Sequence, residues 1–190
     1  DLRFELVAGD DAIDQVTSYA GLRKFHIEGH RFFLNNQPIF LRFVLDQGFY
    51  PDGIWTAPTD AALKRDIELA QAAGFNGARL HQKVFEQRFH YWADHLGYLT
   101  WGEFCDWGTD FAQPQAIANH QREWREIVLR DLNHPSIIAW TPFNETSAGP
   151  WPLQICPTTW WAPAATISGS APPDAVCSAT TWPKHIGARA

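Results

Sequence analysis

The stretch HPSIIAWTPFNET, residues 134–146, is mostly apolar from residue 137 to 143 and then ends on Asn144 and Glu145. An apolar run without polar alternation predicts a strand buried on both faces, as in a parallel sheet covered by helices. Such sheets carry their functional residues where the strands end. We therefore expect a buried strand at 137–143, with Asn144 and Glu145 at a functional edge.

The same arrangement repeats upstream of this strand. Three further apolar runs predict strands at 39–45, 75–80 and 98–104. Between them, apolar residues at helical spacing predict helices at 60–73, 85–96 and 114–132. Their ends carry helix signals: Thr59 or Asp60 as a cap, Gly74 and Gly97 as stops, and Pro114 at a start. Four strands alternating with three helices predict parallel βαβ units and an α/β fold.

The two ends of the chain follow other patterns. Alternation over residues 2–6 predicts a half-buried strand, and residues 25–27 and 31–34 predict a hairpin around a turn at Glu28 and Gly29. From residue 150 on, the βα pattern stops, and Pro and Trp are scattered without a period. We expect an irregular tail over 150–190, or alternatively a coding sequence that loses its reading frame near Gly149. Since the chain starts at Asp1 and holds no Met, we expect it to come from a longer gene product.

The composition bounds the class of protein. The chain has 190 residues, which suits one domain or part of one, and a net charge of −6 without clustered Lys and Arg. We therefore expect no nucleic-acid partner. No apolar run reaches the roughly 20 residues of a membrane span, so we expect no membrane partner. Three Cys at unrelated spacings fit neither a disulfide framework nor a zinc site.

Every predicted strand of the βα region ends in polar residues or Trp. These strand-end candidates are Asp46, Arg79, His81, Trp101, Glu103, Asn144 and Glu145. Taken singly, each could cap a helix or satisfy loop backbone. Because the carboxyl ends of parallel strands meet at one edge, we interpret them together as one candidate site.

Several blocks of the sequence resemble glycoside hydrolase family 2. The blocks are SYAGLRKF (18–25), FLNNQPIFLR (33–42), LDQGFYPDG (45–53), TAPTDAALKRDIELAQAAGFNGARLHQKV (56–84), YWADHLGYLTWGE (91–103) and NHPSIIAWTPFNE (133–145). The resemblance covers about residues 17–149. Asn36 and Phe43 stand where the family commonly has Gly.

This resemblance implies a retaining β-glycosidase. The family includes β-galactosidases, β-glucuronidases and β-mannosidases with a (β/α)8 barrel preceded by β-sandwich domains. By this implication, residues 1–20 are the end of an immunoglobulin-like sandwich with its linker. Residues 21–149 are then the first four strands of a TIM barrel.

The resemblance also implies roles for the strand-end residues. Glu145 is the expected general acid/base, and Asn144 the expected partner of the sugar 2-hydroxyl. Arg79, His81 and Glu103 match positions around the reacting ring, and we add Asp46 and Trp101 as substrate-binding candidates. The expected partner is a β-linked carbohydrate.

The chemistry of a general acid explains why an apolar strand would precede Glu145. A carboxyl group that must hold a proton near neutral pH needs surroundings that disfavour its charged form. Trp101, Trp140 and Phe143 are the predicted walls. Retention also needs a second carboxylate about 5 Å away as nucleophile. After Glu145 the only acidic residue is Asp174, so we expect the nucleophile to be missing and the chain alone to be inactive. The alternative is a non-catalytic half barrel that at most binds sugar.

We expect no metal and no cofactor. His90 and His95 are five residues apart, so they do not share a helical face, and residues 104–107 lack the His through which some β-galactosidases of this family hold magnesium. Half a barrel leaves strand edges open, which predicts self-association. The cellular location stays open, with the cytoplasm favoured.

Overall fold

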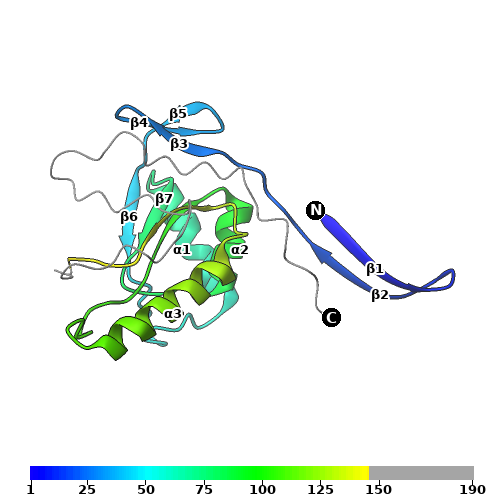
Figure 1. Cartoon of the computed structure of the whole chain (residues 1–190). Helices are drawn as coiled ribbons and strands as arrows, with labels where there is room; N and C mark the ends of the chain where they lie inside the picture. The colour runs from blue at the N-terminus through cyan, green and yellow to red at the C-terminus, as the bar shows by residue number, and fades with distance from the viewer. Residues whose placement is uncertain (146–190) are drawn as a thin grey trace.

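The computed structural model describes residues 1–145 (Figure 1). The predicted tail at 150–190, and with it the reading-frame hypothesis, lies outside the described residues. The described part contains a two-stranded, a three-stranded and a four-stranded sheet. The four-stranded sheet, with the helices beside it, is the part that carries the strand-end residues.

The four-stranded sheet is parallel throughout, as the alternating pattern predicts. Its order is β6-β7-β8-β9, and every neighbouring pair runs in the same direction. The strands are β6 (Phe43–Asp46), β7 (Gly77–Leu80), β8 (Leu99–Glu103) and β9 (Ile137–Thr141). The crossovers contain α1 (Asp60–Ala72), α2 (Gln87–Leu96) and α3 (Pro114–Asp131). The predicted α/β class is confirmed, while closure into a barrel stays a prediction.

The predicted helix ends are confirmed, except for the start of α2. The Thr59 side chain caps α1 by accepting a hydrogen bond of 3.1 Å from the Ala62 amide. Gly97 ends α2 in the left-handed conformation, with φ 66, and Pro114 occupies the first turn of α3. Phe85 lies before α2 instead of opening it.

The helices pack on one face of the sheet. Leu63 and Ile67 from α1 and Phe89 from α2 form one buried cluster with Leu80 of β7. Further along the sheet, the Trp124 ring of α3 meets the edge of the Trp140 ring of β9, with centroids 5.8 Å apart. Apolar burial on this face therefore holds the helices on the sheet. The opposite face of the sheet is not covered by these helices.

The first predicted strand of the βα region is wrong in its extent and burial. Residues 39–45 are split between β5 (Gln37–Ile39) and β6, and Leu45 is 54% exposed. Among the described residues, β6 pairs only with β7 and is therefore an edge strand. The inner face of the sheet, which is the face turned away from the helices, also has no covering layer over β6 in the described part of the chain. The open edges at β6 and β9 are where the predicted self-association would occur.

The N-terminal residues form a hairpin that projects from the helical body (Figure 1). Strands β1 (Leu2–Ala8) and β2 (Asp11–Ser18) are antiparallel, and every residue of both strands is exposed. The prediction of a half-buried strand is wrong for the described residues, because a two-stranded ribbon has no second layer to bury it. β2 was not predicted, since its polar residues hide the alternation. The sandwich domain stays a prediction.

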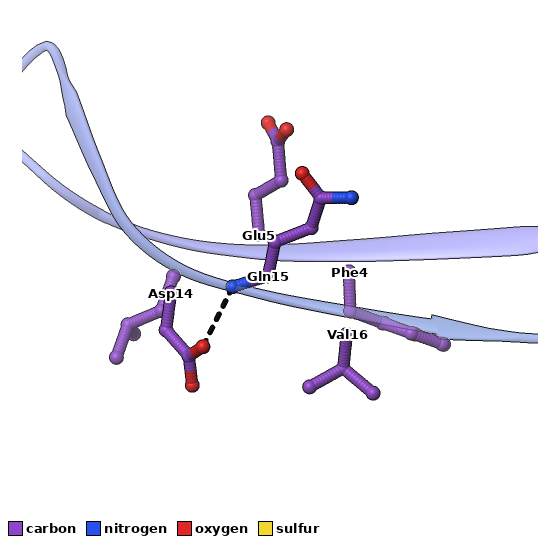
Figure 2. A pocket seen from close by; sticks show the side chains of 6 residues that line it. Phe4, Glu5, Asp14, Gln15 and Val16 are labelled. Atoms are coloured by element: carbon purple, nitrogen blue, oxygen red, sulfur yellow. Dashed lines mark hydrogen bonds between the residues drawn. The ribbon is translucent and has the colours of Figure 1, made fainter.

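A shallow hollow lies on this hairpin. It is lined by Phe4, Glu5, Leu6, Asp14, Gln15 and Val16, and Figure 2 shows their side chains projecting to both sides of the ribbon. Its labelled polar groups do not converge on one point. The hollow is therefore not a candidate for chemistry, and it belongs to a different sheet from the strand-end residues.

The predicted second hairpin is confirmed, and it connects to the parallel sheet. Strands β3 (Phe25–Glu28) and β4 (Arg31–Leu34) pair around Gly29, and β5 adds a third strand. The preceding linker is attached to the start of β9. The Arg23 guanidinium donates to the backbone oxygens of Pro135, at 2.8 Å, and Ile137. This places the N-terminal end of the parallel sheet against the linker.

Gly77 is required by the packing of the inner face. A Cβ there would overlap the ring of Phe43 on β6 and the backbone oxygen of Leu99 on β8. We expect Gly77→Ala to lower the free energy of unfolding of this chain by about 3 kcal/mol, measured by urea denaturation. The additional substitution Phe43→Leu should not restore stability, because the Leu99 oxygen is backbone. A Gly77→Ala variant as stable as the wild type would contradict this packing.

His90 makes the fold sensitive to acid. Its ring is 2% exposed in α2, with Asp131, His134, Arg130 and Asp94 as the charged neighbours, and burial lowers its pKa to about 4. The unfolded chain, with an ordinary His pKa near 6.5, therefore binds the proton more readily than the folded chain. The contribution of neutral His90 to the free energy of unfolding is complete above about pH 6.5. It should fall by on the order of 3 kcal/mol as the pH drops to about 4.

The variant His90→Leu tests this acid sensitivity. Urea denaturation between pH 7 and pH 4 should show a shallower loss of stability than in the wild type, since the titrating group is gone. His30→Gln, at an exposed position in the β3–β4 turn, is the matched control and should keep the wild-type slope. An unchanged slope in His90→Leu would show that other groups cause the acid sensitivity.

Candidate functional site

Strand register places Arg79, Trp101 and Glu103 on the face of the sheet away from the helices, whereas Asp46 pairs with Leu80. Leu45, Arg79, Trp101 and Ala139 are cross-strand neighbours in one row. The next row alternates to the other face and contains Leu80, which is 1% exposed in the helix-facing cluster. Because successive strand residues point to opposite faces, Glu103 shares the face of Trp101.

Arg79 connects the ends of three strands. Its Nε donates to Glu103 Oε2 at 2.6 Å, and its Nη2 donates to Asn144 Oδ1 at 2.7 Å. The Glu103 side chain is completely buried, whereas the Arg79 side chain is 32% exposed. One guanidinium edge thus faces protein groups on β8 and after β9, while the side chain stays partly open to solvent.

His81 lies beside the same carboxylate. Its Nδ1 lies 2.9 Å from Glu103 Oε1 without forming a hydrogen bond to it. Glu103 Oε1 instead accepts a hydrogen bond of 3.0 Å from the backbone amide of Gln82. The Trp107 ring meets the His81 ring edge-on, at 5.3 Å between centroids. The buried Glu103 is therefore the centre on which β7 and its following loop converge.

Gln82 and Asp106 belong to this site, although they were not among the predicted site residues. Gln82 Nε2 donates to Asp106 Oδ1, and Gln82 Oε1 accepts from the amides of Asp106, at 3.0 Å, and Trp107, at 3.2 Å. Asp106 Oδ2 accepts a hydrogen bond of 3.1 Å from the backbone amide of Asn144. Both side chains lie in polar segments directly after predicted strands. That position was the available signal.

The contacts close into a ring, which we call the strand-end ring. It runs from Arg79 to Glu103, Gln82, Asp106, Asn144 and back to Arg79. Glu103, Gln82, Asp106 and Asn144 are all buried. Buried polar groups are stable only when they are hydrogen-bonded, and here each member satisfies the next. The ring fixes the relative positions of three strand ends.

Glu145 follows the ring directly. It is exposed and takes a left-handed backbone conformation, with φ 55. The prediction that Trp140 and Phe143 wall its carboxyl group is wrong for the described residues. Trp140 packs on Trp124 of α3, and Phe143 stacks on His120 of α3 at 4.8 Å between centroids. Both side chains point to the helix-covered side of the sheet, where they pack against α3.

Of the two remaining candidates, Trp101 lies at the site and Asp46 lies outside it. Trp101 lies on the inner face, and its Nε1 donates to Thr141 Oγ1 at 2.6 Å, which fixes the ring next to Glu103. Asp46 instead turns back on its own loop, where its carboxylate accepts from the Gly48 amide at 2.8 Å. Burial raises the pKa of Asp46, and the nearby Asp66 raises it further. The structure thus brings together all the predicted binding residues except Asp46.

The strand-end ring and Trp101 offer groups that a polyhydroxylated ligand could use. A partly open guanidinium, an amide and an indole on one face can donate, accept and pack against a sugar ring. Among residues 1–145, no group of three or more His, Cys, Asp and Glu is placed to hold a metal ion. No helix in that range is long and apolar enough to cross a membrane.

Proteins related in sequence are β-glycosidases by name. A protein of Formosa agariphila with the provisional name β-glucuronidase is 30% identical over 147 residues, which are 76% of this chain and 18% of that protein. A β-galactosidase of Vibrio vulnificus is 29% identical over 137 residues, 68% of this chain and 13% of its own length. This chain thus spans less than a fifth of either relative. No family model matches it.

Solved structures that resemble this chain include a β-glucuronidase as well. A β-glucuronidase from Ruminococcus gnavus, solved in complex with D-glucuronic acid, superimposes with a TM-score of 0.66 at 27% sequence identity. The superposition covers 75% of this chain and 24% of that chain. The same enzyme in complex with a C6-substituted uronic isofagomine gives a TM-score of 0.65 at 28% identity. The likeness therefore extends from sequence to fold.

Proposed function

This chain is homologous, over about three quarters of its length, to β-glucuronidases and β-galactosidases of glycoside hydrolase family 2, and from this we propose that it is part of a retaining β-glycosidase. Residues 21–145, the described part of the predicted domain at 21–149, would contain the first four strands of a (β/α)8 barrel, and residues 1–20 would be the end of a preceding sandwich domain. The strand-end ring is the observation that carries the proposal. It gathers Arg79, Glu103 and Asn144 at the carboxyl ends of three successive strands, where barrel enzymes have their sites.

Each predicted binding residue would have a task that fits its chemistry. Asn144 would hydrogen-bond the sugar 2-hydroxyl, with its Oδ1 held by Arg79. Arg79 and Trp101 would face the reacting sugar, the first through its exposed edge and the second through its ring. His81 and Glu103 would support them from below. Asp46 would join only if its loop opened, since its carboxylate now accepts from Gly48.

Glu145 would act as general acid/base. It is the residue after Asn144, so the strand-end ring brings it to the same edge of the sheet. As an acid it would protonate the glycosidic oxygen, and as a base it would activate the water that releases the sugar. The walls that keep it protonated would come from the substrate and from barrel strands beyond β9, because Trp140 and Phe143 pack on α3.

The nucleophile would come from sequence outside this chain. Retention needs a carboxylate about 5 Å from the acid. Among the described strand ends, Glu103 is already engaged by Arg79 and the Gln82 amide. A non-catalytic half barrel that binds sugar is the alternative, and the open inner face with Leu45 at 54% exposure is the observation that favours it.

Hydrolysis of aryl β-glycosides separates these two functions. The full-length protein that contains this chain should hydrolyse at least one of the nitrophenyl β-glucuronide, β-galactoside and β-mannoside, and the 190-residue chain alone should hydrolyse none of them. If the full-length protein turns over no member of the panel while the chain binds the free sugars, the half barrel is a binding module and the glycosidase proposal fails.

A further inference from the structure

The donors and acceptors of the strand-end ring can be arranged in only one way. Two backbone amides, those of Asp106 and Trp107, donate to Gln82 Oε1. This fixes the orientation of the Gln82 amide, so that its Nε2 must point to Asp106 as a donor. The Asn144 backbone amide, which can only donate, occupies the other carboxylate oxygen of Asp106. Both oxygens of Asp106 must therefore accept, and only a carboxylate can do so.

The ring also holds Asn144 by two independent atoms. Asp106 takes its backbone amide, and Arg79 takes its side-chain oxygen. The next residue, Glu145, has φ 55, a conformation that costs a non-glycine residue on the order of 1 kcal/mol and persists only when the surroundings impose it. The direction in which the chain enters Glu145 is thus set by the hold on Asn144.

We propose that Asp106, oriented by Gln82, is a positioning residue that aims Glu145 at the glycosidic oxygen. Asp106 does not itself touch substrate, and it acts through the Asn144 amide. This inference rests on the proposed acid/base role of Glu145. It adds the group that sets the geometry of that role, on the loop after β8 instead of on β9.

A pair of exchanged substitutions tests the proposal. Asp106→Asn removes one of the two required acceptors, and Gln82→Glu places a carboxylate against that of Asp106. Together, Gln82→Glu and Asp106→Asn reverse the donor direction and restore the hydrogen bonds described above. The new carboxylate accepts from the backbone amides of residues 106 and 107 and from the new side-chain amide, whose oxygen accepts from the Asn144 amide. Each variant changes the side-chain shape very little, so the double variant is its own control for folding.

The first readout is amide hydrogen exchange in the 190-residue chain, followed at residues 106, 107 and 144. In each single variant at least one of these amides should exchange about tenfold faster or more, and the double variant should return to wild-type protection. Wild-type protection of all three amides in both single variants would overturn the proposal. So would a double variant less protected than either single one.

The second readout is the leaving-group dependence of kcat in the full-length protein. The single variants should lose about 100-fold on phenyl glycosides, which need the acid, and much less on dinitrophenyl glycosides, which do not. The double variant should recover most of the loss. Equal losses on both substrates would overturn the positioning role. If the wild type hydrolyses neither, the proposed function fails, and exchange at Asn144 then decides alone whether the ring orients this segment.

Discussion

In the full-length protein, Glu145→Gln should reduce kcat for phenyl β-glycosides by about 10²–10⁴-fold, because the glycosidic oxygen no longer receives a proton as it leaves. Dinitrophenyl glycosides should react much faster than phenyl glycosides in this variant, since their leaving group departs without a proton. Formation of the glycosyl-enzyme intermediate would then outrun its hydrolysis, which also needs Glu145 as base. A burst of dinitrophenol before the steady state is the measurement.

A matched control for this substitution lies on the surface of α3. Glu126→Gln makes the same chemical change at an exposed position away from the strand ends, and it should leave kcat unchanged. Equal losses of Glu145→Gln on both leaving groups would point to a binding or folding role instead. Near-normal rates on phenyl glycosides would exclude Glu145 as the acid.

A large effect on stability is also expected from Glu103. Its side chain is completely buried and accepts from the Arg79 guanidinium and the Gln82 amide, with the His81 ring nitrogen 2.9 Å away. Glu103→Leu would leave the Arg79 charge and the Gln82 amide without these acceptors. Removing one partner of a buried ion pair costs about 3–5 kcal/mol. Because Arg79 is 32% exposed, we expect a loss of about 3 kcal/mol by urea denaturation of this chain.

A double variant separates the charge from the packing. Arg79→Leu combined with Glu103→Leu removes both partners and should cost less than the sum of the single variants. The exposed substitution Glu126→Leu should change the free energy of unfolding by no more than about 0.5 kcal/mol. Strictly additive losses from Arg79 and Glu103 would mean that the pair does not interact in solution.

The elements of the parallel sheet could be predicted because their signals are local. Apolar runs and helical spacing mark β7, α2, β8, α3 and β9, and caps such as Thr59 and Gly97 mark the helix ends. The grouping of Arg79, Glu103 and Asn144 follows from one rule, that parallel strands end at one edge. This rule needs no knowledge of side-chain contacts.

The errors concern faces and neighbours, which depend on residues far away in sequence. Trp140 was predicted beside Glu145, but the helix-facing side of β9 holds it against Trp124. A register shift between Thr100 and Trp101 changes how β9 lies against β8, and no local pattern reveals it. Gln82 and Asp106 are bonded across 24 positions, so their partnership also depends on the fold. Leu45 is 54% exposed and lies in β6, which is an edge strand among the described residues.

The site and the fold depend on the same buried contacts. The strand-end ring holds β7, β8 and β9 at the edge where the proposed chemistry occurs, and Gly77 lets the Phe43 ring lie across the inner face beside it. At the other end of the sheet, Arg23 holds the linker to the start of β9. Destabilising substitutions in the ring are therefore expected to disturb activity and folding together, which is why the exchanged pair at Gln82 and Asp106 is the more informative design.

The central claim, that Glu145 is the acid/base of a retaining β-glycosidase, is tested most directly by adding azide to the full-length Glu145→Gln variant with a dinitrophenyl β-glycoside. Azide is a nucleophile that needs no general base, so it should attack the trapped glycosyl-enzyme, raise the rate of turnover and give a glycosyl azide of β configuration by proton NMR. Turnover that azide leaves unchanged, with no glycosyl azide formed, would contradict the assignment.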